Sequence, residues 1–593
     1  MGVLFFCSFQ VSAQNWRDKQ WLRLLVYRET FTGYESEADD ASFFVHPQGK
    51  FSPSKELKAF ITSLHQDDPD PKKNSYCRFP ARVRWLKKYT TVPASKVQCE
   101  DYEKFRKRIS PKSISVVFSS YYLNNPASSF GHTFIRLGKN TNSDSTATEL
   151  LDTGINYGAM TEGAGPVVFA IGGLTGWFSG NYNAVPYYYK VREYNDFETR
   201  DLWSYELDMS QEEIDLILDH IWELGHTKFD YFFLTENCSY HVLSILESAR
   251  PTLELHRFLP RLYTIPSETL KALMAENLVS KITFRAAPST QFYHQLNLLD
   301  SIERKAMEEL VFQKKEVGEL SPERKALIYD TALSLVDYKY AKDILKGDEK
   351  AQQIKRPLLV SRSKIPVRSK DLNFSEKFSK APHLGHGQKR LGLGYVNFDS
   401  KNFLEAEWRF AFHDVLDNDI GYPPKTKLEV GKAIVRTDGI DVELREVSLV
   451  DVLMLGKWDV YNNSSSWKVR LGQWQTRDED QFLSTQGVVG GYGYSYEYKW
   501  FTPYLLGHLE TSYVSEKLHK FKLGYGADAG LLVDFNHRWK LNSVLEGRFH
   551  PWTESAFKNE VRYSNQSFGV GGLHQVFFED GEQEVSLKFF KYF

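Results

Sequence analysis

FLEAEWRFAFHDV, residues 403 to 415, alternates apolar and polar side chains along its length. The apolar set is Ala406, Trp408, Phe410 and Phe412, and the polar set is Glu405, Glu407, Arg409 and His413. Successive side chains of a β-strand point to opposite faces. The segment therefore predicts a strand with one apolar and one charged face.

The same period of two continues, with turns between the segments, from Gln388 to the end of the chain. It is clear in residues 467–472 and 521–529. Segments of about ten residues with one apolar and one polar face are typical of a membrane-spanning β-barrel with lipid outside and water inside. We expect an antiparallel barrel of about twelve strands in residues 388–593. A soluble antiparallel barrel or sandwich is the alternative.

The last segment, Val585 to Phe593, resembles the terminal strand of bacterial outer-membrane barrels. Val585, Leu587 and Phe589 share one face, and the chain ends on an aromatic residue. Lys591 interrupts that face, and a charge near the membrane interface costs little. This ending favours the membrane barrel over the soluble one.

Composition limits the classes of partner. The 593 residues carry 74 Lys and Arg against 76 Asp and Glu, so no global basic field attracts nucleic acid. Aromatic residues make up 15% of the chain, which suits β-structure and membrane interfaces. We therefore expect an outer-membrane location and no nucleic-acid partner.

The N-terminus predicts export. An apolar run, Val3 to Phe9, precedes the small residues of Val11-Ser12-Ala13, which suggests a signal peptide at residues 1–13 cleaved after Ala13. The run is too short to span a bilayer, which needs about 20 residues. A lipoprotein signal ending at Cys7 is the alternative, but bulky phenylalanines before the cysteine fit it poorly.

Cleavage would leave Cys77, Cys99 and Cys238. We expect a Cys77–Cys99 disulfide in an oxidising compartment, which would leave Cys238 as the free and reactive thiol. Three unpaired thiols in a reducing cytosol are the alternative.

The chain as a whole predicts a multidomain protein, α+β followed by all-β, with helical flanks around a central domain. The expected divisions are a signal peptide at 1–13, a helical N-terminal domain at 14–110, a Cys/His catalytic domain at 111–250, a helical region at 251–346, a basic linker at 347–387 and the barrel at 388–593. The glycine-rich segment 163–180 is expected to be a hairpin or a lid over an acyl-chain groove. No lysine follows these glycines as in a phosphate loop, and no metal-ligand spacing is found, so we predict no cofactor.

Two motifs in the catalytic domain carry chemistry. His132 begins an apolar strand, and Cys238 precedes a helix-like run. A helix N-terminus and a nearby imidazolium both stabilise a thiolate, which can attack a carbonyl and form a thioester. A buried, inert core cysteine is the alternative. His241, three residues after Cys238, is a second imidazole that we rank below His132.

A third residue should orient the imidazole of His132. If residues 131–137 and 149–157 form a hairpin, Asn156 or Asp152 returns beside His132. We expect Asn156, since the hairpin register brings it nearer, whereas a slip of one residue would favour Asp152.

These motifs resemble the Lnb N-terminal periplasmic domain family, named for a bacterial lipoprotein N-acyltransferase. The resemblance covers about residues 113–250 and rests on Leu123 to Phe134, Asn156 to Ala159, and Asn237-Cys238. Cys77 to Arg82 and Ala381 to His386 resemble modules that accompany this domain. The order of histidine first and cysteine later is similar to the circularly permuted papain-like enzymes of the lecithin:retinol acyltransferase type.

The resemblance implies a periplasmic enzyme with Cys238 as nucleophile and His132 as base. It would take an acyl chain from a phospholipid and deliver it to an amine, such as that of a lipoprotein, or to water. The expected substrate-binding residues are Asn124, Ser128, Tyr157, Trp177 and Asn237. Two alternatives stay open: a cysteine peptidase or amidase acting on cell-wall peptides, and a non-enzymatic barrel with a periplasmic binding domain.

Overall fold

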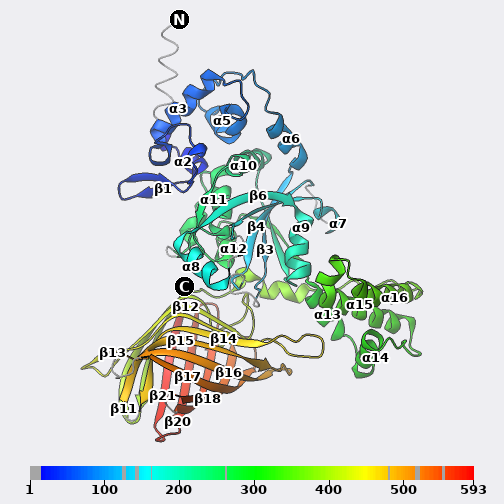
Figure 1. Cartoon of the computed structure of the whole chain (residues 1–593), viewed down its shortest axis with the longest axis vertical. Coiled ribbons are helices and arrows are strands. Elements are labelled where there is room, and N and C mark those ends of the chain that lie inside the picture. The colour runs from blue at the N-terminus through cyan, green and yellow to red at the C-terminus, as the bar shows by residue number, and fades with distance from the viewer. Residues whose placement is uncertain are drawn as a thin grey trace. The chain divides into compact units, whose positions relative to one another are not determined.

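The computed structural model describes residues 15–122, 129–140, 146–161, 163, 165–260, 263–478, 481–514, 521–550 and 554–593. The chain forms two compact units, Met1–Asn373 and Phe374–Phe593, which are described separately (Figure 1). The predicted signal peptide and two expected substrate-binding residues, Asn124 and Ser128, lie outside the described residues.

The second unit is a closed antiparallel β-barrel (Figure 1). Each strand pairs with the next, and the last pairs with the first. The strands are β10 (Arg390–Phe398), β11 (Lys401–His413), β12 (Thr426–Thr437), β13 (Val442–Met454), β14 (Ser466–Asp478), β15 (Gln481–Ser495), β16 (Phe501–Val514), β17 (Phe521–Asp534), β18 (Trp539–His550), β19 (Glu554–Ser564), β20 (Phe568–Phe577) and β21 (Gln583–Tyr592). The predicted barrel of about twelve strands is confirmed.

The two faces of the barrel wall differ as the alternation predicts. In β11, Glu405, Glu407 and Arg409 are buried inside, whereas Leu404 is exposed on the outer face. Other exposed outer-face residues are Leu505, Leu509, Leu523, Leu587 and Phe589. Exposed aromatic residues gather at the end where β10 begins and β21 finishes: Trp458, Tyr494, Tyr496, Tyr498, Trp500, Phe535, Trp539 and Phe568. An apolar band with an aromatic girdle is the exterior of a membrane barrel.

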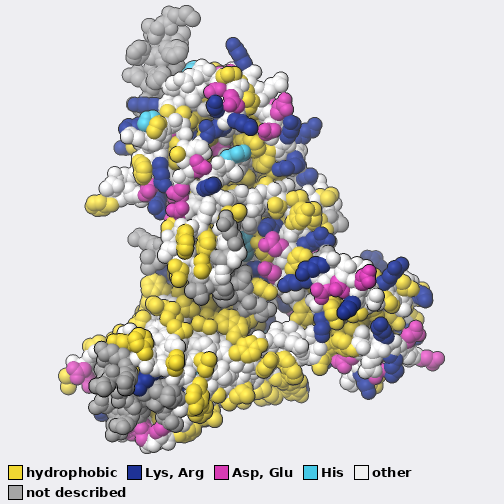
Figure 2. All heavy atoms as spheres, in the orientation of Figure 1, with side chains coloured by type: hydrophobic (Ala, Val, Ile, Leu, Met, Phe, Trp, Pro, Cys, Tyr) yellow, Lys and Arg dark blue, Asp and Glu magenta, His cyan; other side chains and the backbone are white. Residues whose placement is uncertain are grey.

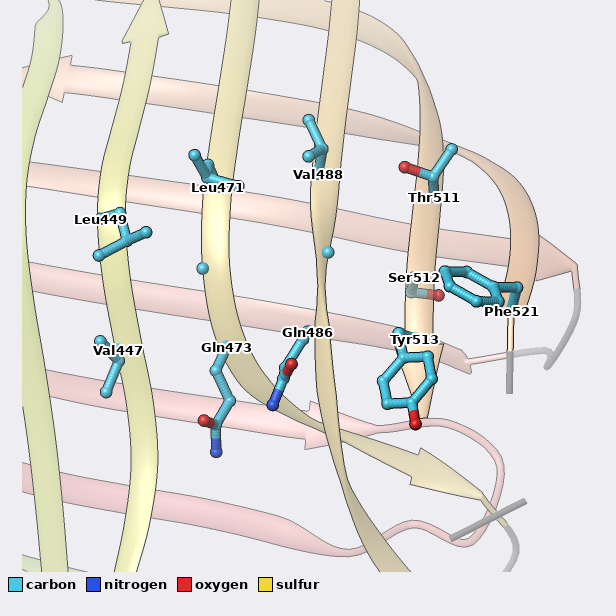
Figure 3. Close-up of a pocket in the computed structure, with 12 residues that line it drawn as sticks. Val447, Leu449, Leu471, Gln473, Gln486, Val488, Thr511, Ser512, Tyr513 and Phe521 are labelled. Carbon is cyan, nitrogen blue, oxygen red and sulfur yellow. The ribbon is translucent and has the colours of Figure 1, made fainter. Parts of the chain in front are cut away.

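A shallow depression of about 540 Å³ lies on this outer wall (Figure 3). Leu449, Leu471 and Val488 point into it from neighbouring strands, and Phe521 borders it. Gly472 and Gly487 also line it. The depression belongs to the outer wall of the barrel.

Inside the barrel, one carboxylate joins several strands. Asp417, in the loop between β11 and β12, is fully buried. Its carboxylate accepts hydrogen bonds from Arg390 (3.0 Å), Arg409 (2.6 Å) and Arg562 (2.7 Å), and from the Tyr592 hydroxyl (2.7 Å). These donors come from β10, β11, β19 and β21, so the loop is fastened to distant parts of the wall.

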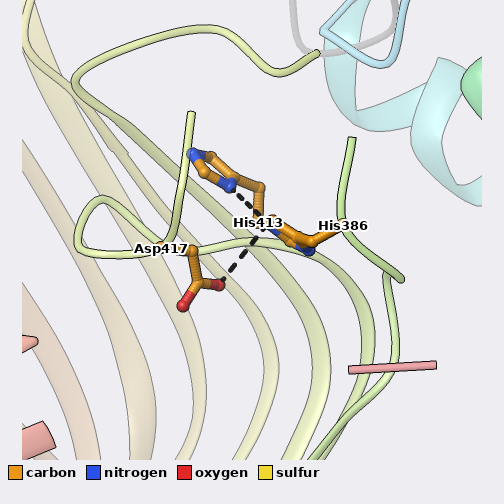
Figure 4. A group of neighbouring side chains, drawn as sticks. All are labelled: His386, His413 and Asp417. Carbon is orange, nitrogen blue, oxygen red and sulfur yellow. Dashed lines mark hydrogen bonds and ion pairs between the residues drawn. The ribbon is translucent and has the colours of Figure 1, made fainter. Parts of the chain in front are cut away.

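Two histidines adjoin this carboxylate (Figure 4). His386 Nε2 lies 3.0 Å from His413 Nδ1 and 3.9 Å from Asp417 Oδ2. The three possible ligand atoms lie within 4.8 Å of one another, a spacing that suits a metal ion. The Asp417 carboxylate already accepts hydrogen bonds from three arginines, so a metal ion here would compete with them for its oxygens.

Removing the Asp417 carboxylate should destabilise the barrel strongly. Asp417→Ala would leave three buried guanidinium groups without their shared anion, and we expect a loss of about 3–5 kcal/mol. Asp441→Ala, at an exposed carboxylate, is the matched control. Thermal unfolding in detergent, followed by circular dichroism, measures the difference. Equal midpoints for Asp417→Ala and wild type would show that this network carries no stability.

The first unit is built on a seven-stranded sheet of order β8-β6-β5-β4-β3-β7-β9. These strands are β8 (Phe229–Tyr231), β6 (Phe178–Pro186), β5 (Thr153–Ala159), β4 (His132–Gly138), β3 (Ser113–Ser119), β7 (Leu202–Leu207) and β9 (Val279–Arg285). Helices α10 (Gln211–Leu224) and α11 (Cys238–Ala249) pack against its central strands. A capping box of Ser210 and Glu213 begins α10. This unit is therefore a mixed α/β structure, as predicted.

The N-terminal part is mainly helical. Its helices are α2 (Lys19–Leu24), α3 (Pro53–Gln66), α4 (Ser75–Arg78), α5 (Pro80–Leu86) and α6 (Glu100–Ile109), and a hairpin is formed by β1 (Tyr27–Thr30) and β2 (Gly33–Ser36). Cys77 and Cys99 form a disulfide. Arg82 pairs in the interior with Glu56 and with Glu223 of α10, which joins these helices to the sheet domain.

Three sequence-based expectations are wrong. Residues 251–346 are not purely helical, because β9 completes the central sheet beside β7. Within the predicted linker, residues Glu349–Ser363 form α16, which ion pairs with Asp330 and Asp337 hold against α15 (Pro322–Leu345). The glycine-rich segment forms helix α8 (Pro166–Thr175) rather than a hairpin.

The remaining helices are short or lie beyond the sheet. They are α7 (Thr146–Glu149), α9 (Tyr187–Lys190), α12 (Pro266–Ala275), α13 (Pro288–Leu296) and α14 (Ser301–Phe312). Of these, α12 bears on the candidate site because it contacts α11.

Candidate active site

Cys238 occupies the first turn of α11. The side chain of Asn237 caps this helix, and its Oδ1 accepts hydrogen bonds from the backbone N–H groups of Ser239 and Tyr240. The Cys238 side chain is buried and is the free thiol of the described residues. Its position places the sulfur in the positive field of a helix N-terminus, which favours a thiolate.

His132 lies at the start of β4 and interacts with the thiol of Cys238. Its Nε2 is 2.7 Å from Asn156 Oδ1. In the β4–β5 pairing Asn156 stands opposite position 134, so it is a diagonal neighbour of His132 on the same face of the sheet. An acceptor oxygen at Nε2 fixes the proton there and leaves Nδ1 as the basic nitrogen for the thiol.

The two groups change each other's protonation. Burial raises the pKa of the Cys238 thiol, but His132, the backbone N–H of Thr133 and the Ser239 hydroxyl outweigh burial and lower it to about 7. Burial lowers the pKa of His132, but the charge on Cys238 and hydrogen bonds with Cys238 and Asn156 raise it overall. The pair therefore favours a thiolate beside an imidazolium at neutral pH.

Further hydrogen bonds hold the pair in place. Thr133 Oγ1 and Ser239 Oγ are 3.0 Å apart, which links β4 to the first turn of α11. Asn237 Nδ2 donates to the carbonyl oxygens of Phe233 (2.9 Å) and Thr264 (2.6 Å). Asn237 thus positions the helix that carries Cys238, in addition to lining the pocket as expected.

A small pocket of about 60 Å³ opens at the sulfur. Its walls are mostly apolar or aromatic, and they consist of Phe130, Gly131, His132, Tyr231, Phe233, Leu234, Asn237, Cys238, Thr264, Ile265 and Pro266. Residues 264–266 lie beyond the predicted end of the catalytic domain at residue 250. Pro266 at the first turn of α12 is a helix-start signal, but no spacing in the sequence relates it to Cys238.

Three expected site residues lie elsewhere. Asp152 does not orient His132: its Oδ1 accepts from the backbone of Lys139 and its Oδ2 pairs with Arg136 at 3.7 Å. Tyr157 is buried with its ring against His241 and does not line the pocket. Trp177 is 71% exposed and also lies outside the pocket lining.

His241 is buried among aromatic rings and does not replace His132. Its ring centroid is 3.9 Å from that of Tyr157 and 5.0 Å from that of Phe229. Burial lowers the pKa of His241 to about 3, and neither ring nitrogen has a hydrogen-bond partner among the residues that the structure describes. A neutral imidazole without contact to the thiol is a packing residue.

Asn156→Ala should slow reaction of the thiol with an acyl donor by about a hundredfold, because the wrong tautomer of His132 becomes accessible. Asn183→Ala, at the exposed cross-strand partner of Asn156, is the matched control and should react normally. Stopped-flow measurement with an activated ester gives both rates. Equal rates for the two variants would exclude a positioning role for Asn156.

Family models account for most of the chain. Residues 101–276 match the Lnb N-terminal periplasmic domain. Residues 14–89, 282–372 and 379–571 match three domains of unknown function, DUF7843, DUF7842 and DUF7840. No curated protein matches the chain.

Several solved outer-membrane proteins are similar to part of the chain. The KdgM porin has 7% identity and a TM-score of 0.23, and the match covers 34% of this chain and 99% of the porin. The NanC porin has 11% identity and a TM-score of 0.21, with coverages of 34% and 99%. The Acinetobacter baumannii outer membrane protein Omp33 has 10% identity and a TM-score of 0.18, with coverages of 35% and 99%.

Location follows from the family match and from the wall of the barrel. Within the described residues, no helix has the length and apolar character needed to cross a membrane. The matched domain is periplasmic, and the closed barrel has the apolar exterior and charged interior of an outer-membrane protein. The chain thus carries an Lnb N-terminal periplasmic domain at residues 101–276 and belongs to the periplasm and outer membrane.

Proposed function

We propose that this protein is a cell-envelope thiol acyltransferase or lipid hydrolase that works through an acyl thioester on Cys238. The contact of a buried thiol with His132, itself held by Asn156, carries the proposal. A thiol with a pKa near 7 is the activated form that nucleophilic catalysis requires. An inert core cysteine would have its pKa raised by burial alone.

The proposed reaction has two steps. The Cys238 thiolate attacks the ester carbonyl of a phospholipid, a C–S bond forms and the ester C–O bond breaks, and the imidazolium of His132 gives its proton to the departing alcohol. His132 then takes a proton from an amine or a water molecule, which attacks the thioester and releases the thiolate. The backbone N–H of Cys238, at the helix N-terminus, is the proposed donor to the oxyanion.

The lining of the pocket supports a lipid substrate over a peptide. Phe130, Phe233 and Ile265 surround the sulfur, and His132 is the one acidic or basic side chain besides the thiol among the described residues of the lining. A peptidase that binds cell-wall peptides needs groups for their charges. The order of base and nucleophile along the chain also supports a permuted papain-like arrangement for this domain.

Product analysis separates transfer from hydrolysis. The full chain is placed in phospholipid vesicles with a peptide whose N-terminal cysteine is lipidated and has a free amine. Acyltransferase activity predicts an amide on the peptide, and hydrolase activity predicts free fatty acid, both absent with Cys238→Ala. A readily alkylated thiol with no lipid turnover would redirect the assignment to peptide substrates, and an unreactive thiol would rule out the enzyme.

A further inference from the structure

Helix α8 presents apolar side chains to the outside of the first unit. The exposed fractions are 46% for Val168, 55% for Ile171, 57% for Leu174 and 71% for Trp177. Val168, Ile171 and Leu174 follow one another at intervals of three residues on α8, and Trp177 comes just after the cap of the helix at Gly176. Hydrophobic side chains gather over α8 on the face shown in Figure 2. A soluble helix normally buries such side chains, so this face calls for an apolar partner.

The chain segment that carries this face contains no charged residue. From Gly163 to Tyr189 the sequence contains no Asp, Glu, Lys or Arg. Met160, which is 56% exposed, pairs through its backbone N–H with Ser179 and so lies beside the strand that follows Trp177. An uncharged apolar patch that ends in a tryptophan matches the boundary region of a bilayer.

The helix is joined directly to the wall of the thiol pocket. The backbone N–H of Phe233, a pocket residue, donates to the carbonyl oxygen of Gly173 at 2.7 Å. A Cβ at Gly173 would lie 3.3 Å from Phe233 Cβ, and one at Gly176 would lie 2.4 Å from Phe232 Cζ. Glycine at both positions thus permits close packing of α8 beside the pocket.

The size of the pocket explains why such a surface is needed. Its volume of about 60 Å³ is far below the roughly 300–1,000 Å³ of pockets that enclose most of a small-molecule ligand. The carbonyl end of an acyl donor fits there, but its hydrocarbon chain does not. The chain must stay in an apolar medium outside the pocket while the carbonyl reaches Cys238.

We infer that α8 docks on a phospholipid bilayer, with Val168, Ile171, Leu174 and Trp177 in contact with the acyl chains, and presents lipid esters to Cys238. This inference rests on the proposed function for its substrate. We assign a lipid surface as the partner of this face because its residues are uncharged and because the same chain carries a membrane barrel. Helix α8, Pro166–Thr175, has 10 residues, whereas a helix needs about 20 to cross a bilayer, so it would lie at the membrane surface.

The test uses a phospholipid with a photoreactive diazirine at the end of one acyl chain. The full chain, with Cys238→Ala to stop catalysis, is reconstituted into vesicles that contain this lipid, irradiated, and mapped by mass spectrometry. We expect cross-links on the peptide that contains α8, lost in the double variant Ile171→Asp/Leu174→Asp. Ile302→Asp, at a 77% exposed apolar residue of α14, is the matched control and should keep them.

A second readout separates this inference from the proposed function. With Cys238 intact, Ile171→Asp/Leu174→Asp should lower acyl-thioester formation from vesicles at least about tenfold, while iodoacetamide alkylation of Cys238 stays normal. Lipid cross-links confined to residues 390–593 would overturn the inference. Loss of a dimer in the double variant, with no lipid cross-links on α8, would overturn it in favour of a second copy. Cross-links on α8 without any thioester would uphold it and refute the proposed function.

Discussion

Cys238→Ser should abolish lipid turnover, with a loss of at least about 10⁴-fold. Serine is close in size to cysteine, so α11 should still begin at this residue and Asn237 should still cap it. A hydroxyl, however, is far less acidic than a thiol, and His132 cannot hold it as an anion at neutral pH. Phospholipid turnover by the full chain in vesicles measures the loss, and circular dichroism checks the fold.

Ser244→Ala is the matched control for this variant. Ser244 lies on the same helix, and its hydroxyl donates a hydrogen bond to the Tyr240 carbonyl oxygen. The control variant should turn over lipid at the wild-type rate. Turnover by Cys238→Ser at more than a few per cent of wild type would contradict a thioester on this residue.

His132→Ala should have the second largest effect, through the acidity of the thiol. With the imidazole gone, burial dominates and the pKa of Cys238 rises from about 7 to its usual value of 9 or above. At pH 7 the thiolate fraction would fall from about one half to about one per cent, so alkylation should slow by about fiftyfold. The half-maximal rate should move from near pH 7 to pH 9 or higher.

Iodoacetamide labelling of the Cys238 peptide across pH 5–10 measures this shift. His226→Ala, at an exposed histidine after α10, is the control and should keep the wild-type profile. An unchanged profile in His132→Ala would mean that the helix N-terminus alone activates the thiol.

The barrel could be predicted from sequence because a period of two marks the two faces of each strand. The alternation is broken at Phe412, which is fully buried against Tyr422 rather than exposed to lipid. Lys591, by contrast, is exposed on the outer face, where the alternation puts it. The alternation along a strand predicts which side chains face lipid and which face the interior. It does not predict how the loop that contains Asp417 packs, because that packing depends on residues far apart in the sequence.

The hairpin register gave Asn156 as the partner of His132, since both residues fall on one face. It also shows why Asp152 is excluded. In the observed pairing Asp152 comes next to Gly138, at the far end of β4 from His132. By contrast, no sequence pattern related residues 264–266 to Cys238, because a loop and the start of α12 bring them there.

Two elements were mispredicted for identifiable reasons. The predicted linker contains Pro357, a residue that disfavours a helix interior, but α16 accommodates it, and an ion pair between Arg362 and Asp330 holds the helix in place. Glycines 172, 173 and 176 suggested a hairpin, although they permit close packing of a helix on Phe178, Phe233 and Phe232. In both cases tertiary contacts outweighed local propensity.

The most direct test of the account is the intact mass of the full chain after incubation with phospholipid vesicles, beside Cys238→Ala and His132→Ala. The account predicts that wild type gains the mass of one fatty acyl chain, released by hydroxylamine and mapped to Cys238, and that neither variant gains it. No such adduct on wild type, with the thiol still open to alkylation, would contradict it.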